Sequence, residues 1–205
     1  MSNKKINTKI DDNDDEDAPN IATRVIGDYI YLFYEGSIES DFLHHIANTL
    51  MPYPSNKKLV MVMNSGGGDP FLCNSFYTFM SRMGLCKIIG IGQLSSAALA
   101  MCLDCKKHKM SVYIDPLCHV VLHRVKTTFI NEQRYERIIK YNDSWVNTYE
   151  KLFDRINEDI ISVLPKTLLR DYKAGQDVYL MGQDLIEYKV FKELKDGVLG
   201  KEQNV

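Results

Sequence analysis

Apolar residues follow two alternating patterns along the chain. Short continuous runs, rich in β-forming residues, occupy positions 29–34, 58–63, 86–91, 110–114, 118–122 and 178–180. Runs of this kind predict strands, several of them covered on both faces. Between them, apolar residues recur every three or four positions and predict helices over 37–50, 70–83, 97–103, 167–172 and 183–194. This alternation predicts an α/β fold built from parallel βαβ units.

A much longer helical pattern covers residues 131–164 and stops at Pro165. Its apolar positions step by three or four and are Ile138, Tyr141, Trp145, Tyr149, Leu152, Ile156, Ile160 and Val163. At 1.5 Å per residue, a helix of this length would reach roughly 50 Å. That is more than a domain of this size needs to cover its own core, so we expect the helix to project toward another subunit.

A glycine-rich turn joins the strand at 58–63 to the helix that follows it. The turn reads Asn64-Ser65-Gly66-Gly67-Gly68. Asp69 is placed to cap the helix, Pro70 suits its first position, and Gly84 suits its end. The strand, the turn and the helix therefore form one well-defined unit.

The two ends of the chain differ from its centre. Residues 1–21 are polar and contain the acidic run at 11–17. A charged segment with so little to bury predicts a disordered tail, which either keeps the protein soluble or serves as a docking or gating element. We expect one folded domain over residues 22–198 and a flexible C-terminal tail over 199–205.

Composition narrows the class of protein. A chain of 205 residues with 45% hydrophobic content suits one domain with a real core. The formal net charge of −2 argues against nucleic acid or an anionic membrane as partner. Five scattered cysteines in mostly apolar surroundings suggest a reducing compartment. With neither a signal-peptide pattern nor a long apolar run, the expected location is the cytoplasm.

One short motif has the spacing of zinc ligands. Cys102, Cys105 and His108 provide three donors, but a fourth is not evident, and Cys102 falls in an apolar helical stretch. Closed structural zinc sites use four ligands. We therefore expect neither a metal nor another cofactor.

Four separate features together favour nucleophilic catalysis. Ser96 stands at a strand-to-helix turn, where free amides and the positive end of the helix dipole are available. A serine needs a base and a group that orients the base, and His123 and Asp177 can fill these roles. The backbone N–H of Ala97, with that of Gly67 or Gly68, can stabilise an oxyanion. Each feature alone is a weak signal, and only their combination indicates a hydrolase.

These residues resemble the ClpP family, the proteolytic subunit of the caseinolytic protease. The family's Asn-Ser-Pro-Gly-Gly turn is similar to residues 64–68, and its Gly-Gln-Ala-Ala-Ser turn is similar to residues 92–96. The second match places the nucleophile at Ser96 rather than Ser95. The family's proline, seven residues before its histidine, matches Pro116 and His123.

The resemblance continues to the C-terminal part of the chain. The family's last catalytic residue, an aspartate before Phe-Leu, matches Asp177 before Tyr179-Leu180, and the later Glu-Tyr matches Glu187-Tyr188. The likeness covers about residues 29–194 in the order Ser, His, Asp. It implies the ClpP/crotonase spiral of ββα units with a long protruding handle helix, through which two heptamer rings stack.

The family likeness also implies an activity and partners. It implies a self-compartmentalising serine endopeptidase that assembles as a heptamer or tetradecamer and cleaves unfolded polypeptides. An AAA+ ATPase would supply these polypeptides, and ATP would be needed only by that partner. The chain departs from the family at residues 124–128, where a glycine-rich strand is expected, and it lacks the axial-loop motif. The first departure puts peptide binding and ring stacking in question, and the second argues against unfoldase docking. Both departures are what we expect of a divergent member of the ClpP family, for example a phage-encoded one.

Two other functions fit the same resemblance. One is a phage head-maturation protease that processes scaffold or capsid protein without an ATPase. The other is a non-catalytic ring subunit that keeps the fold for assembly or partner binding. The sequence alone does not separate these from the peptidase.

Overall fold

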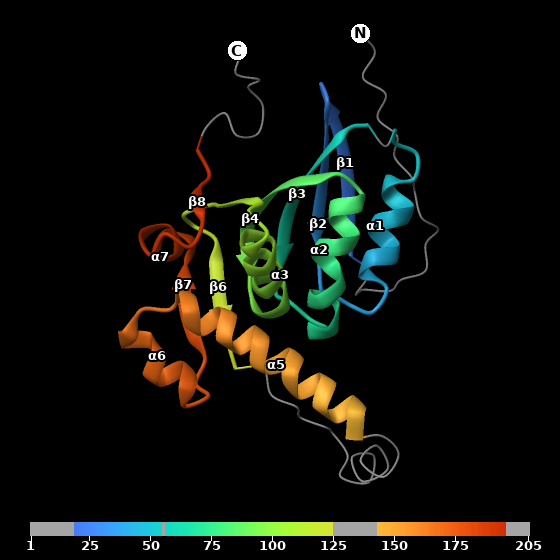
Figure 1. The fold of residues 1–205 in the computed structure, drawn as a ribbon. Coiled ribbons are helices and arrows are strands. Elements are labelled where there is room, and N and C mark those ends of the chain that lie inside the picture. Colours follow the sequence, from blue (N-terminus) through green and yellow to red (C-terminus); the bar gives the residue numbers. More distant parts are fainter. Residues whose placement is uncertain (1–18, 55, 125–142, 196–205) are drawn as a thin grey trace.

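The structure is a computed structural model that describes residues 19–54, 56–124 and 143–195, with the backbone alone for 143–150. Its strands form a branched sheet whose main path has the order β1-β2-β3-β4-β5-β8 (Figure 1). These strands are β1 (Asn20–Ile26), β2 (Tyr29–Glu35), β3 (Lys58–Ser65), β4 (Leu85–Leu94), β5 (Ser111–Ile114) and β8 (Lys192–Glu193). A ribbon of β6 (His119–Leu122) and β7 (Val178–Met181) joins the sheet through β4.

The helices pack on one face of the main sheet and around the ribbon. They are α1 (Phe42–Leu50), the short 3₁₀ turn η1 (Pro70–Leu72), α2 (Cys73–Arg82), α3 (Ser96–Lys107), α5 (Asp143–Val163), α6 (Lys166–Lys173) and α7 (Gly182–Glu187). None of the helices in the described ranges has the length and apolar character needed to cross a bilayer.

Alternate residues of β3 explain why its apolar run is continuous. Leu59, Met61 and Met63 point into the large core beneath the helices, whereas Val60 and Val62 belong to a smaller cluster on the opposite face. All five side chains are almost completely buried. A strand that buries both faces needs apolar residues at every position, as the sequence has.

The predicted parallel arrangement is confirmed for the centre of the sheet. Strands β2, β3, β4 and β5 pair in parallel. One edge differs, because β1 pairs antiparallel with β2, and within the ribbon β6 pairs antiparallel with β7; β8 at the other edge is parallel to β5. Asn20 and Ile21, assigned above to the tail, begin β1. Gly27, with φ of 55°, lies between β1 and β2 and allows the tight reversal of the chain.

The predicted closing helix over 183–194 is wrong in its second half. Helix α7 ends at Glu187, and Lys189 adopts a left-handed φ of 58° that a helix cannot continue through. The chain then extends into β8, which pairs with β5. The apolar residues Val190 and Phe191, which suggested a longer helix, instead bury into the core from the bend that precedes β8.

The predicted caps around the glycine turn are confirmed. The Asp69 side chain accepts a hydrogen bond of 2.8 Å from the N–H of Phe71, and Pro70 is the first residue of η1. Gly84 follows α2 with a left-handed φ of 83°. Local sequence chemistry therefore sets both ends of this unit.

Part of the long predicted helix is described, as α5, and residues 131–142 lie outside the described ranges. The described side chains pack on the protein's own core, because Leu152, Phe153, Ile156 and Ile160 are all buried. Tyr172 of α6 donates a hydrogen bond of 2.8 Å to Asn157 of α5. This part of the helix is thus integral to the domain, and its use as a handle stays a prediction.

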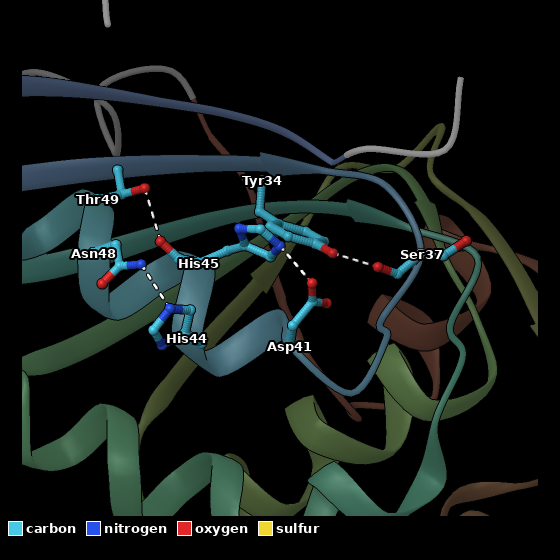
Figure 2. Close-up of polar contacts among 7 residues, drawn as sticks. All are labelled: Tyr34, Ser37, Asp41, His44, His45, Asn48 and Thr49. Atoms are coloured by element: carbon cyan, nitrogen blue, oxygen red, sulfur yellow. Dashed lines mark hydrogen bonds and ion pairs between the residues drawn. The ribbon is translucent and has the colours of Figure 1, made fainter. Parts of the chain in front are cut away.

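The two adjacent histidines of α1 make contacts within their own helix. His45 pairs with Asp41 at 2.7 Å, and His44 with Asn48 at 2.9 Å, each across one helical turn (Figure 2). Beneath them, the Tyr34 hydroxyl donates to the carbonyl of Ser37. Burial raises the pKa of Tyr34 to about 12, so this buried hydroxyl stays a donor.

Candidate active site

Ser96 is the first residue of α3, directly after the end of β4. Its Oγ lies 2.8 Å from Nε2 of His123, within hydrogen-bonding distance. Ser96 also has a left-handed φ of 51°. For a residue with a Cβ, this conformation costs roughly 1–2 kcal/mol and persists only where the surroundings enforce it. The strained turn aims the hydroxyl at the imidazole.

Ser95 has a different environment although it is the adjacent residue. It is buried, and its Oγ accepts a 2.8 Å hydrogen bond from the N–H of Val121 in β6. Its own N–H donates to the carbonyl of Ser65 at 3.1 Å. Ser95 therefore fastens the turn to β3 and β6, whereas Ser96 is the serine that meets the histidine.

His123 and Asp177 lie at the open end of the antiparallel ribbon. The last pair of the ladder is Leu122 with Val178, so one further step along the register brings His123 opposite Asp177. Facing residues in such a ribbon have Cβ atoms about 4.5–5.5 Å apart. Asp177 is exposed and makes no hydrogen bond to any described residue. The structure thus joins Ser96 to His123, whereas Asp177 stands one step past the end of the ladder and makes no bond to this pair.

The glycine turn lies against the start of α3. A Cβ built on Gly67 would be 2.6 Å from the Ser96 Cβ and 3.0 Å from the Ala97 nitrogen. Both Gly67 and Gly68 also have positive φ values, of 100° and 147°. Only glycine permits this conformation together with so close an approach.

Hydrogen bonds distinguish the two candidate oxyanion donors in this turn. The N–H of Gly67 already donates to Oγ of Ser65 at 3.1 Å. On the other side, the Gly67 carbonyl and the Asp69 N–H both bond to Ile38, at 2.8 and 2.6 Å. Successive amides of an extended chain point in opposite directions, so the N–H of Gly68 points away from Ile38. Within the described residues it has no acceptor, and neither does the N–H of Ala97.

Two structural supports of the site were not recognised from the sequence. Asn64 accepts a 2.8 Å hydrogen bond from the N–H of Gln93 and donates to Glu35 at 2.9 Å. Gly92 has a φ of 59°, and a Cβ there would be 2.6 Å from Oδ1 of Asn64. Asn64 and Gly92 both belong to the turns at 64–68 and 92–96 that match the family motifs, so the sequence did contain a signal for them. The bond from Ser95 to Val121 had no such signal, because it depends on which strands are neighbours.

A shallow cavity of about 280 Å³ lies along the ribbon. It is lined by residues 119–121 of β6, residues 179–181 of β7, and Asp184. Because side chains alternate along a strand, His119 and Val121 share a face of β6 with His123. The cavity lies on the same ribbon as His123, but Ser96, His123 and Asp177 are not among its lining residues.

The residues of the zinc-like motif have separate environments. Cys102 and Cys105 are buried in the core, and burial raises the pKa of Cys105 to about 12. His108 is exposed and stacks on Tyr77, with ring centroids 3.9 Å apart. Within the described ranges, no three metal-ligand side chains come together.

Comparison with known proteins supports the fold only. No family model matches the sequence, and no curated protein matches it. Among solved structures, a mutant of ClpP1 from Listeria monocytogenes is similar, with a TM-score of 0.56 and 17% sequence identity. The match covers 80% of this chain and 90% of that chain. The chain therefore has a mixed α/β fold similar to that of ClpP, while the spiral of ββα units and its activity remain predictions.

Proposed function

We propose that this chain is a ClpP-like serine endopeptidase that hydrolyses peptide bonds through an acyl-enzyme. The observation that carries the proposal is the 2.8 Å contact between Oγ of Ser96 and Nε2 of His123. The contact occurs at a strained helix N-terminus, beside two backbone N–H groups without an acceptor among the described residues. A nucleophile, a base and a pair of oxyanion donors are the parts that acyl transfer requires.

In the proposed reaction, Ser96 attacks the carbonyl carbon of the scissile bond while His123 takes the hydroxyl proton at Nε2. The negative charge that forms on the carbonyl oxygen is held by the N–H groups of Gly68 and Ala97. His123 then gives its proton to the leaving amine, which leaves an ester on Ser96. Water activated by His123 hydrolyses this ester and regenerates the serine.

Asp177 is assigned to orient His123. Its place opposite His123 in the ribbon register supports this role. A carboxylate that accepts the Nδ1 proton of the histidine fixes the tautomer in which Nε2 is the base. The two side chains are not bonded in the structure, so the proposed triad requires the Asp177 carboxylate to move to Nδ1 of His123.

The substrate is proposed to be an unfolded polypeptide. The cavity along β6 and β7 offers a surface where the side chains of an extended chain can bind. The similar fold supports assembly into a heptamer or tetradecamer, in which access to Ser96 would be restricted. Delivery by an AAA+ partner is a weaker part of the proposal, since the axial-loop motif is missing.

Cleavage of an unfolded protein tests this function. Wild-type chain, Ser96→Ala and His123→Ala are incubated with denatured casein, and the products are identified by mass spectrometry, with native mass spectrometry of each assembly. We expect many peptides from wild type and none from either variant. Cleavage restricted to one or two sites in a phage scaffold or capsid protein would favour a maturation protease. A ring-shaped assembly that cleaves neither casein nor a scaffold or capsid protein would favour a non-catalytic subunit.

A further inference from the structure

The face of the main sheet opposite the helices carries a small apolar cluster. Its buried members are Tyr31, Val60, Val62 and Ile89. The partly buried residues that pack around them also come from the strands or their ends: Ile26, Tyr29, Cys86, Ile91, Tyr113 and Leu194. No helix of the described residues contributes to this cluster. We call this surface the open face.

Cationic side chains surround the cluster. The Lys58 ammonium lies 5.8 Å from the centre of the Tyr29 ring. Lys87 of β4 and Lys192 of β8 lie over the ring of Tyr113, which is on β5 between these two strands, each at 5.5 Å from the ring centre. Such positions are favourable for a cation, but they leave the outer side of each ammonium group accessible to an anion.

A fourth cation shares this surface. Arg24 pairs with Tyr31 in the antiparallel register of β1 and β2, and paired residues lie on the same side of a sheet. None of the four cations is in an ion pair with a described residue. Glu35, also on this side, lies at the far end of β2, where its carboxylate accepts from Asn64. The open face is therefore strongly cationic on a chain whose net charge is −2.

The complementary charge lies in the same chain. Residues 11–17 contain six carboxylates in seven positions, and the run ends three residues before β1 begins at Asn20. β1 forms one edge of the open face. An acidic segment of this density has no apolar content of its own to bury, so it requires an external cationic surface to become ordered.

The length of this segment fits the width of the open face. Six strands spaced by about 4.8 Å span about 24 Å from β1 to β8. Nine extended residues, from Asn20 back to Asp11, reach about 30 Å. The cations follow at increasing distance from β1, with Arg24 on β1, Lys58 on β3, Lys87 on β4 and Lys192 on β8. The acidic run is therefore long enough to cross the open face from β1 to β8.

We propose that residues 11–17 dock across the open face of their own chain. Their carboxylates pair with cations of the set Arg24, Lys58, Lys87 and Lys192, and the segment lies over the side chains that already bury the apolar cluster. Each exposed ion pair is weak, but the attachment at β1 makes the binding intramolecular, which raises the local concentration of the segment to the millimolar range. The docked segment is a cover that salt, or a competing acidic partner, displaces.

Lysine acetylation of the full-length protein tests the proposal. Wild type is compared with a variant in which Asp11, Asp12, Asp14, Asp15 and Asp17 become Asn and Glu16 becomes Gln. We expect Lys58, Lys87 and Lys192 to react at least threefold more slowly in wild type at 20 mM salt. Lys166 and Lys173, exposed on α6, serve as controls and should react equally in both chains. In 1 M NaCl the difference should disappear, because the Debye length falls to about 3 Å.

Zero-length carbodiimide crosslinking identifies the occupant. We expect crosslinks from residues 11–17 to lysines of the open face, and a mixture of isotope-labelled and unlabelled protein should show them within single chains. Equal acetylation rates in the two proteins at low salt would overturn the proposal. Crosslinks found only between labelled and unlabelled chains would also overturn it, in favour of the tail of a second copy. Neither readout depends on peptidase activity, so the result is separate from that of the proposed function.

Discussion

The two faces of the main sheet are made by the same strands but have different roles. On the helix-covered face, Leu59, Met61 and Ile88 lie in the large core, and the strand ends on this side hold the serine turn. On the open face, a few apolar residues are ringed by lysines and tyrosines. Neighbouring residues of one strand therefore stabilise the core on one side of the sheet. On the other side, in our proposal, they form the surface that binds residues 11–17.

Burial alone therefore does not identify a functional surface in this fold. Val60 and Met61 are equally buried, yet Val60 belongs to the cluster of the open face and Met61 to the core beneath the helices. The catalytic proposal depends on the carboxyl edge of the sheet, where β3 and β4 end beside each other. Substitutions at this edge, in the core and on the open face should therefore have effects of different kinds and sizes.

The largest effect is expected from alanine at Gly67. An added Cβ would be 2.6 Å from the Ser96 Cβ at a φ of 100°, so the turn and the start of α3 must separate. We expect the rate of serine labelling by a fluorophosphonate to fall by about 100-fold or more, because separating the turn from α3 displaces the Gly68 donor, and loss of an oxyanion donor acts on this scale.

Gly66→Ala is the matched control for that variant. A Cβ on Gly66 would have ordinary contacts, the nearest at 3.6 Å from the Gln93 side chain. Its labelling rate should stay within about threefold of wild type. Equal loss of labelling in both variants would show that the turn tolerates no side chain at either position. It would contradict the expectation that the close contact of Gly67 with Ser96 is the cause.

Adjacent residues of β4 allow a direct comparison of the two faces. Ile88 is completely buried under the helices, and Ile88→Ala should lower the free energy of unfolding by about 2–5 kcal/mol. Lys87 faces the other side, and Lys87→Ala should cost less than about 1 kcal/mol. Urea denaturation measures both. A larger loss for Lys87→Ala would mean that the open face is part of the structural core.

Stability should also fall at alkaline pH because of groups on the helix-covered side. Burial raises the pKa values of Cys73, Cys105 and Cys118 from 9.0 to about 12. Above pH 9 the unfolded chain releases these protons while the folded chain keeps them, so stability is full below pH 9 and is lost as the pH rises toward 12. We expect a decrease of at least about 1 kcal/mol between pH 8 and pH 10.

A triple Cys→Ala variant at these positions provides the control for the pH prediction. It should lose clearly less stability over the same pH interval, whatever its stability at pH 8. An identical slope in both proteins would exclude the thiols as the source.

The smallest effect concerns thiol access. Cys86 is half-buried beside the open-face cluster, whereas the other four cysteines are buried. With iodoacetamide at pH 8, Cys86 should react at least about tenfold faster than the others, as exposure controls access to a thiol. Peptide mapping after a time course measures this. Faster reaction of Cys102 or Cys105 would mean that the core opens readily.

Periodicity predicted the centre of the fold because local residue patterns determine it. The continuous apolar runs of β3 and β4 and the capped unit after Gly68 are each specified by neighbouring residues. Strand β1 was missed, since its seven residues alternate between exposed and half-buried positions and gain their pairing only from β2. The end of α7 was also missed, because the turn at Lys189 depends on Val190 and Phe191 reaching the core.

The candidate site was partly predictable for the same reason. Ser96 and Gly67 belong to short motifs whose chemistry can be read locally. The preference for Gly68 over Gly67 as a donor needs the hydrogen bonds to Ser65 and Ile38, which only the folded chain provides. The place of Asp177 opposite His123 likewise follows from a ribbon register that no local pattern encodes.

The central claim is that Ser96, activated by His123, is a nucleophile. Labelling with a fluorophosphonate, followed by mass-spectrometric mapping of the adduct, tests it most directly. We expect one phosphonyl group on Ser96 in wild type, none in Ser96→Ala, and labelling at least about 100-fold slower in His123→Ala. An unlabelled wild-type protein, or an adduct that persists in Ser96→Ala, would contradict the account.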